Sequence, residues 1–287
     1  MKNIPVRNIS VIPDSLNLSE KFRIRTVQEL QNEQKLIQDT HRHDYYFILA
    51  LIKGKGEHTI DFIKYEITDY SIFFMRPGQV HQLSLQKGCT GFLMQFSKDF
   101  YRPGNKTDQQ LLRSASNKNF CRLDLKKSKN LFNVLSYIYK EYTEREKMYF
   151  DIIKANLSIF FVELTRYREN QIKPENKNTM FTQERLDEFL ELLENNISKN
   201  KQVSEYADML NLSTFQLNSM TKSNLGKTCS TLIDEQIILE AKRYLLATTE
   251  QVKEIAYNLG YEDVSYFIRF FKKHTGQTPE AYRINFT

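Results

Sequence analysis

The chain has 287 residues, which is enough for about two domains of ordinary size. Its 40% hydrophobic content is typical of a globular protein, and no apolar run is long enough to span a bilayer. Residues 1–15 carry no apolar signal-peptide core, so we expect a cytoplasmic protein without a membrane partner. The three cysteines are scattered without paired spacing, which predicts neither a disulfide framework nor a zinc site.

The first third of the chain predicts short strands separated by turns. Residues 22–25 alternate, residues 45–52 are apolar throughout, and Gly54-Lys55-Gly56 gives a turn. The other predicted strands cover residues 59–62, 65–67 and 71–75, the surroundings of residue 83, and 92–96, with a break at Pro77-Gly78. Many short strands joined by turns predict a small barrel or jelly roll.

From residue 129 the apolar period becomes helical and predicts an antiparallel helix pair. The first stripe consists of Leu131, Val134, Leu135, Ile138 and Tyr142, and the second of Ile153, Leu157, Phe160, Phe161, Leu164 and Tyr167. With Ile152 and Ile159 added, the second helix has more apolar surface than one stripe needs, which predicts a homodimer interface. In the alternative, the wide stripe packs on both the barrel and the first helix. A polar segment around Pro174 predicts an interdomain linker.

The last hundred or so residues contain one helix-turn-helix pattern twice. Residues 203–207 correspond to 252–256, and Leu210-Asn211-Leu212 corresponds to Leu259-Gly260-Tyr261. Ser213 with Gln216, and Asp263, predict caps for the second helix of each copy, and Gly226 and Gly276 predict their ends. Thr278-Pro279 predicts a last short helix. A helical stripe between the copies (Leu232, Ile233, Ile237, Ala241, Tyr244 and Leu245) predicts a shared core.

The distribution of charge matters more here than its total. The chain has a formal net charge of +6, whereas residues 180–287 contain 12 basic and 15 acidic side chains, a net charge of −3. Placement must therefore carry any argument for nucleic-acid binding. Arg269, Lys272, Lys273 and Arg283 gather on and just after the second helix of the second copy.

The repeated unit resembles the DNA-binding domain of the AraC/XylS family of transcription regulators. The match covers residues 254–273 (EIAYNLGYEDVSYFIRFFKK), followed by Gly276, Thr278-Pro279 and Tyr282-Arg283, together with the first copy. The resemblance implies two helices in successive major-groove segments of double-stranded DNA. It also implies the base-facing residues Phe215, Asn218, Ser219, Val264, Ser265, Ile268 and Arg269.

The chemistry of these positions differs. Arg269 can donate two hydrogen bonds to guanine, and Asn218 can pair with adenine. Val264 and Ile268 could only touch thymine methyl groups. Phe215 is either a base contact or a half-buried packing residue. Lys222, Lys272 and Lys273 are expected on phosphates, where they position the protein without specifying sequence.

The N-terminal strands resemble the cupin-like sensor domain of the same family. The matching segments are residues 41–46 (HRHDYY), 54–60 (GKGEHTI) and 76–81 (RPGQVH). His41, His43 and His81 could bind zinc or iron, but Phe47 and Ile48 stand where metal cupins have a carboxylate ligand. We therefore expect no metal, no cofactor and no catalytic centre. His43, Tyr45, Arg76 and His81 are instead expected to contact a small-molecule effector, or else to bond to nearby backbone.

The sequence thus predicts an α+β multidomain protein. A cupin-like sensor and dimerisation domain with a helix pair covers residues 1–168, a linker 169–180, and an all-α domain with two helix-turn-helix units 181–287. The expected function is sequence-specific transcription regulation by a homodimer, with RNA polymerase as a partner if the protein activates. The alternatives are a metal-dependent cupin enzyme carrying a DNA-binding domain and a regulator without a ligand.

Overall fold

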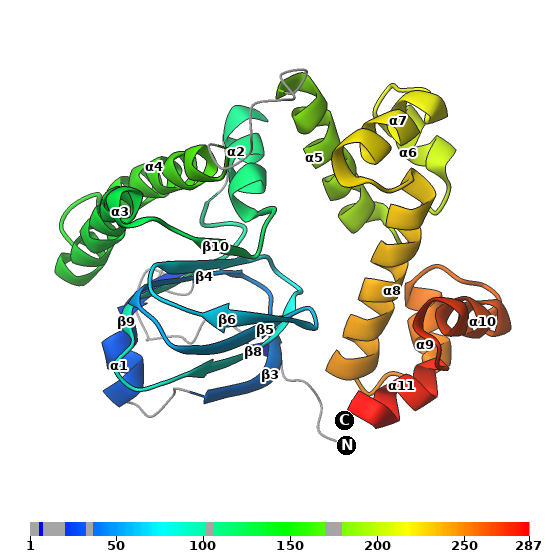
Figure 1. Ribbon diagram of the computed structural model, residues 1–287, viewed down its shortest axis with the longest axis horizontal. Coiled ribbons are helices and arrows are strands. Elements are labelled where there is room, and N and C mark those ends of the chain that lie inside the picture. Colours follow the sequence, from blue (N-terminus) through cyan, green and yellow to red (C-terminus); the bar gives the residue numbers. More distant parts are fainter. Residues whose placement is uncertain (1–5, 8–20, 33–36, 102–105, 170–179, 287) are drawn as a thin grey trace. The chain divides into compact units, whose positions relative to one another are not determined.

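The computed structural model describes residues 6–7, 21–32, 37–101, 106–169 and 180–286 (Figure 1). They form two compact units, one ending with helix α4 (Tyr149–Glu169) and one beginning with helix α5 (Met180–Asn196). Residues 170–179, which make up most of the predicted linker, lie outside the described residues. Within the described ranges, no helix has both the length and the apolar character needed to cross a membrane.

The N-terminal unit is built on two sheets, each with five strands among the described residues. The first has the order β1 (Val6–Arg7), β3 (Ile37–His43), β8 (Val80–Leu85), β5 (Gly56–Ile60) and β6 (Ile63–Ile67). The second has the order β10 (Phe120–Arg122), β7 (Ser71–Met75), β4 (Tyr46–Lys53), β9 (Thr90–Phe96) and β2 (Phe22–Thr26). All neighbouring strands are antiparallel except β1 and β3.

The uninterrupted apolar run of β4 follows from its position between two layers. Phe47, Leu49 and Leu51 belong to the core that both sheets share. Ile48 and Ala50 belong to the core beneath the helices. Since successive side chains of a strand point to opposite faces, a strand that is covered on both faces is apolar at every position.

One predicted strand is shorter than expected. The sequence predicts a strand over residues 59–62, but β5 ends at Ile60. Asp61 and Phe62 have φ of 46° and 70°, so they form a two-residue hairpin turn between β5 and β6. Paired positive φ values are what such a tight antiparallel turn requires.

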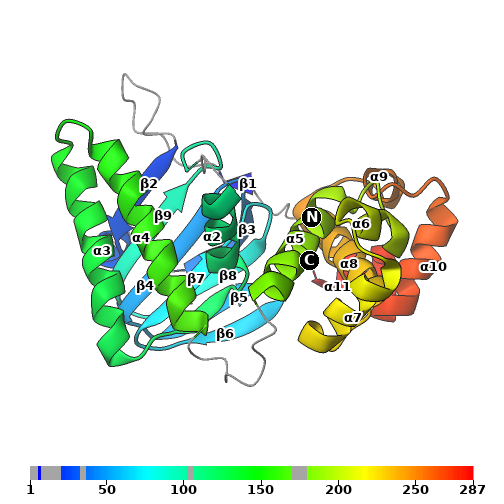
Figure 2. The same ribbon diagram turned by 90° about the horizontal axis from the view of Figure 1, so that it is seen from above.

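The predicted helix pair is confirmed as α3 (Leu125–Glu144) and α4, which lie side by side over the second sheet (Figure 2). The described part of this unit also contains two shorter helices, α1 (Val27–Asn32) and α2 (Lys106–Ser116). The wide apolar stripe of α4 has a different use from the one expected. Ile153, Leu157, Phe160, Phe161 and Leu164 are fully buried within the chain. Ile159 is 50% exposed. The stripe therefore packs on the sheet and on α3 and no longer argues for a homodimer.

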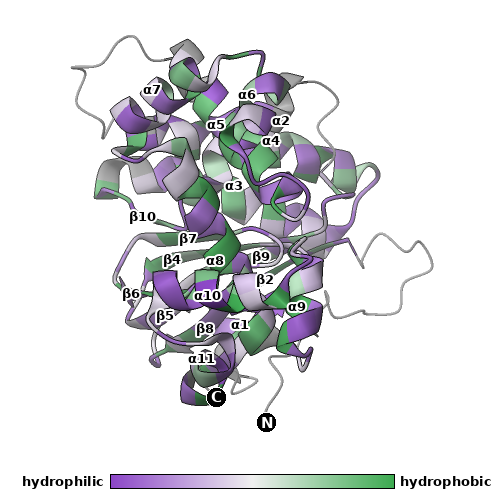
Figure 3. Cartoon of the chain, turned by 90° about the vertical axis from the view of Figure 1, so that its right-hand side faces the viewer, coloured by the Kyte–Doolittle hydropathy of each residue, from purple (hydrophilic) through white to green (hydrophobic). Residues whose placement is uncertain are grey.

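The C-terminal unit is helical, and hydrophilic and hydrophobic stretches alternate along its ribbons (Figure 3). After α5 come α6 (Val203–Met209), α7 (Thr214–Leu225), α8 (Cys229–Ala247), α9 (Val252–Asn258), α10 (Val264–Thr275) and α11 (Pro279–Phe286). Helix α8 packs against α5, α7, α9 and α11. Its predicted stripe is confirmed, because Ile233, Ile237, Ala241 and Leu245 are buried. The α+β two-domain fold class is thereby confirmed.

Candidate nucleic-acid interface and histidine cluster

The first helix-turn-helix unit consists of α6, a short turn and α7. Ser213 caps α7 through a capping box with Gln216, and the two side-chain to backbone hydrogen bonds measure 2.8 and 3.1 Å. The helix ends at Gly226, whose φ of 69° is left-handed. The sequence predicted both ends of this helix, and both are confirmed.

Helix α7 presents a largely neutral surface. Phe215, at its second position, is 80% exposed, so the prediction of a half-buried packing role for it is wrong. Ser219 and Lys222 are exposed as well. An exposed aromatic ring at the start of this helix is accessible to an external partner, and thymine methyl groups suit such a ring.

Asn218 lies in a different environment from the one expected. Its Oδ1 accepts a hydrogen bond of 3.0 Å from the backbone N–H of Cys229, the first residue of α8. Its Nδ2 donates to the carbonyl oxygen of Thr214, also at 3.0 Å. Each end of the amide therefore has one partner inside the protein, and the residue joins α7 to α8.

The second unit consists of α9, its turn and α10. Asp263 Oδ1 accepts from the backbone N–H groups of Ser265 and Tyr266 at 2.8 and 3.1 Å, which confirms the predicted cap. Gly276 ends the helix at a φ of 79°. In the turn, Gly260 has a φ of 73°, and a Cβ placed on it would lie 1.8 Å from the backbone oxygen of Ser198. Only glycine fits this turn.

Helix α10 presents basic side chains to solvent. The Arg269 side chain is 71% exposed, and its Nη2 lies 3.9 Å from Asp263 Oδ2, a distance too long for a hydrogen bond. Ser265, Lys272 and Lys273 are exposed, whereas Val264 and Ile268 are half-buried. The guanidinium is therefore accessible to a nucleic acid, and the two aliphatic residues can offer only part of their surface.

Two residues near this surface lie in environments that the sequence did not predict. Arg283 does not stand with the DNA-facing cations, because its Nε and Nη2 donate to the carbonyl oxygens of Leu245 and Glu250 at 2.9 and 2.7 Å. It fastens α11 to the end of α8. Tyr266 was missed, since an aromatic residue within an aromatic run is expected in the core, yet its side chain is 54% exposed beside Ser265.

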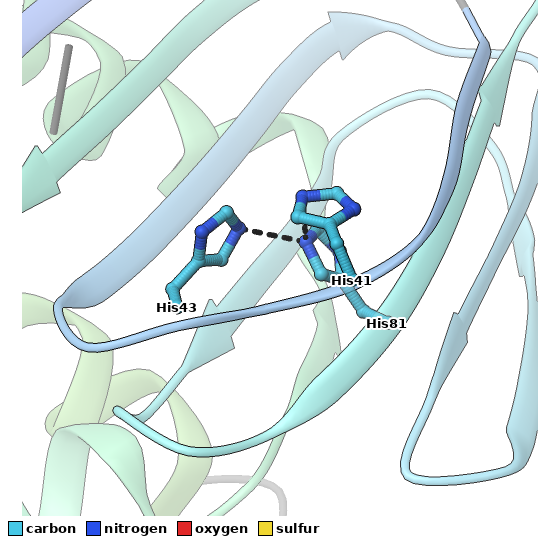
Figure 4. A group of neighbouring side chains, drawn as sticks. All are labelled: His41, His43 and His81. Atoms are coloured by element: carbon cyan, nitrogen blue, oxygen red, sulfur yellow. Dashed lines mark hydrogen bonds between the residues drawn. The ribbon is translucent and has the colours of Figure 1, made fainter. Parts of the chain in front are cut away.

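Four histidines meet inside the N-terminal unit. His41 and His43 lie on β3, His81 on the neighbouring β8 and His58 on β5, which pairs with β8. Each is at most 3% exposed. His81 Nε2 lies 2.8 Å from His43 Nε2 and 3.0 Å from His41 Nε2 (Figure 4). We call these four residues the histidine cluster.

Hydrogen bonds extend the cluster in two directions. His81 Nδ1 lies 2.8 Å from His58 Nε2, and His41 Nδ1 lies 2.6 Å from the carbonyl oxygen of Asp39. Burial lowers the pKa of His58 to about 3. His58 is therefore a neutral imidazole at physiological pH. No role for His58 was predicted, although it lies within one of the segments that resemble the sensor domain.

The structure brings together three of the four residues predicted to contact an effector. The ring of Tyr45 lies 4.3 Å from that of His43, and its hydroxyl accepts from Gln95 Nε2 at 2.9 Å. Phe47 stacks on His43 at 5.4 Å. Arg76 is half-buried in the turn that follows β7. Because His43, Tyr45 and His81 are buried, an organic ligand could reach them only if the sheets opened.

Comparison with known proteins agrees with this architecture. A model described as an AraC-like ligand binding domain matches residues 26–135, and one described as a helix-turn-helix domain matches residues 206–285. The transcriptional activator RhaS of Pectobacterium atrosepticum is 23% identical, over 85% of this chain and 86% of its own. The bifunctional transcriptional activator/DNA repair enzyme AdaA of Bacillus subtilis is 32% identical, over 45% of this chain and 64% of its own.

Among solved structures, the C-terminal domain of the response regulator yesN from Fusobacterium nucleatum is 33% identical to the region it matches. The match covers 34% of this chain and 96% of that domain, with a TM-score of 0.33. A ligand-binding type of β-fold followed by paired helix-turn-helix units defines a two-domain DNA-binding regulator. The chain belongs to the AraC family of transcription regulators.

Proposed function

We propose that this protein regulates transcription by binding a specific DNA site through α7 and α10, which we call the reading helices. The observation that carries the proposal is the exposed Arg269 side chain on α10, next to exposed Ser265 and Lys272. A guanidinium that is free to reach a base edge can bind guanine O6 and N7 with two hydrogen bonds. Phe215 and Ser219 on α7 supply the second contact surface, and Lys222 and Lys272 bind phosphates.

Selection of bound duplexes from a random DNA library tests this function. We expect one enriched sequence in which each protomer protects two major-groove segments about one helical turn, roughly 34 Å, apart. A library in which no sequence is enriched over several rounds, with folded protein, would contradict the proposal. The spacing between selected half-sites also tests whether the protein binds as a homodimer, which we propose with no support from the α4 stripe.

We further propose that the N-terminal unit senses a small-molecule effector and changes how the reading helices of a dimer are presented. The support is the match of residues 26–135 to a ligand-binding domain. Differential affinity of the ligand for the two arrangements would set the size of the response. A thermal-shift screen of metabolites tests it, since a ligand at 100 times its Kd adds about 2.7 kcal/mol of stability. A regulator without a ligand would show no shift.

Several partners and properties follow from this function as proposals of their own. If the protein activates transcription, RNA polymerase is its partner. We propose that the chain is not an enzyme, and the support is its similarity to transcription regulators. A metal-dependent cupin enzyme remains the alternative in another class. The cytoplasmic location predicted from the sequence stays a prediction.

A further inference from the structure

The hydrogen atoms of the histidine cluster can be assigned one ring at a time. A carbonyl oxygen can only accept, so the contact between His41 Nδ1 and the Asp39 carbonyl oxygen places the hydrogen of neutral His41 on Nδ1. The Nε2 atom of His41 then carries a lone pair. That lone pair lies 3.0 Å from His81 Nε2, which in turn lies 2.8 Å from His43 Nε2.

No neutral assignment gives both of these contacts a hydrogen of its own. If His81 carries its hydrogen on Nε2, that one hydrogen faces both His41 and His43. If His81 carries it on Nδ1, the hydrogen points to His58 Nε2, and the lone pairs of His41 and His81 face each other. Repulsion between lone pairs in a buried, low-dielectric place is costly unless a positive charge lies between them.

A divalent cation resolves the conflict, and we propose that the Nε2 atoms of His41, His43 and His81 bind one transition metal ion. The three candidate ligand atoms all lie within 4.8 Å of one another. Two nitrogens bound to zinc at 2.0–2.1 Å stand about 3.3 Å apart in a tetrahedral site. The 2.8 and 3.0 Å separations from His81 must therefore widen slightly, and the His41–His43 separation, which is at most 4.8 Å, must come to the same value. Neutral imidazoles suit zinc, nickel, copper and iron.

The surroundings of the His41 and His81 rings match those of metal-bound histidines. A ligating imidazole usually donates its other N–H to a carbonyl, carboxylate or water, which fixes the ring and its tautomer. His41 Nδ1 donates to the Asp39 carbonyl oxygen, and with the metal bound His81 Nδ1 donates to His58 Nε2. His58 thus acts as a positioning residue that holds His81 without touching the ion.

The proposed metal site links two neighbouring strands and is buried, so it is not open to a substrate. His41 and His43 lie on β3 and His81 on β8, so one ion ties these strands together. The Phe47 ring packs against His43 and His81 at 5.4 and 5.2 Å, where a cupin enzyme would have a carboxylate. The proposal therefore revises the sequence prediction that no metal binds, and leaves the predicted absence of catalysis unchanged. It does not rest on the proposed function.

Zinc titration of the purified full-length protein, stripped with a chelator, tests the site. We expect one equivalent of Zn²⁺ to bind in competition with a chelating dye, and His81→Ala to abolish that binding while circular dichroism reports a folded chain. His274→Ala serves as the control because His274 is exposed on α10 and outside the cluster, and it should bind like the wild type. Folded wild-type protein that binds no zinc, or binding that depends on His274, would overturn the proposal.

Two further measurements keep the outcome clear even if His81→Ala does not fold. Cobalt added to the wild-type protein should give visible absorption bands of a site with nitrogen ligands, which a proton shared among the rings would never give. His58→Phe, which removes the acceptor of His81 Nδ1, should weaken zinc binding about 10–100-fold, whereas His58→Gln should restore part of it. Equal affinity for both variants would refute the positioning role of His58, and absence of the cobalt bands would refute the metal site.

Discussion

The two reading helices occupy equivalent positions in the repeat but present different chemistry. Helix α10 exposes Arg269, Lys272 and Lys273, whereas Lys222 is the single cation of α7, which instead exposes Phe215. The acidic total charge of residues 180–287 therefore conceals a local basic surface on one of two similar helices. A repeated scaffold fixes where a helix stands, and the residues on its outer face decide what it reads. We expect α10 to supply most of the electrostatic attraction and α7 to supply apolar contacts.

The turns of the two units also occupy equivalent positions in the repeat but differ in their packing. Asn211 in the first turn and Gly260 in the second both have positive φ, of 53° and 73°. Gly260 also lies against backbone, and its carbonyl accepts from Lys201 Nζ at 3.1 Å. Asparagine tolerates the left-handed conformation, so the first turn requires only a residue that can adopt a positive φ. The second turn also requires a residue without a side chain.

The largest expected effect comes from filling the second turn. Gly260→Ala should destabilise the protein by about 2–4 kcal/mol, because the new Cβ strains the left-handed backbone and meets the Ser198 carbonyl. Asn211→Ala should cost no more than about 1 kcal/mol, because it meets only the conformational cost. Urea unfolding of both variants checks this, and equal losses would show that the two turns are packed alike.

A smaller effect is expected at the junction between α7 and α8. Asn218→Ala should lower stability by about 1 kcal/mol, because the N–H of Cys229 at the start of α8 loses its acceptor. The exposed neighbour Ser219→Ala should leave stability within about 0.5 kcal/mol of the wild type. A changed base preference for Asn218→Ala, at unchanged stability, would restore the base-reading role that the sequence predicted.

The smallest effect concerns the phosphate contacts. Lys272→Ala should weaken binding to all DNA sequences alike and flatten the plot of log affinity against log salt by about 0.9, the value for one phosphate contact. Lys222→Ala should do the same on the other reading helix. Lys199→Ala, an exposed lysine after α5, is the control and should leave the slope unchanged. A sequence-dependent loss for Lys272→Ala would place this residue on a base instead.

Local chemistry made much of the fold predictable. Ser213 and Asp263 cap their helices because their side chains satisfy nearby N–H groups, and both signals can be read from adjacent residues. Asn218 and Arg283 could not be assigned in this way. Their partners, the N–H of Cys229 and the carbonyl of Leu245, are brought to them by tertiary packing. The sequence alone does not distinguish a polar helix side chain that faces DNA from one that forms hydrogen bonds within the protein.

The histidine cluster shows the same limit. The spacing of His41 and His43 indicated a metal-binding pattern, and the missing carboxylate argued against it. What the sequence could not show is that β5, β8 and β3 are neighbours in that order, which brings His58 against His81. The wide apolar stripe of α4 suggested a dimer interface, but the structure buries it within the chain. Periodicity does not reveal how many elements of its own chain a helix contacts.

The most direct test of the account is the affinity of Arg269→Ala for a selected DNA site and for a scrambled duplex, measured by fluorescence anisotropy at one salt concentration. We expect a loss of about 1–3 kcal/mol on the selected site, a much smaller loss on the scrambled duplex, and relaxed preference at one base pair. Phe215→Ala, measured beside it, should lose affinity for the selected site with no change in salt dependence. If Arg269→Ala weakens both duplexes by the same factor, α10 does not read bases through this residue, and the central claim is wrong.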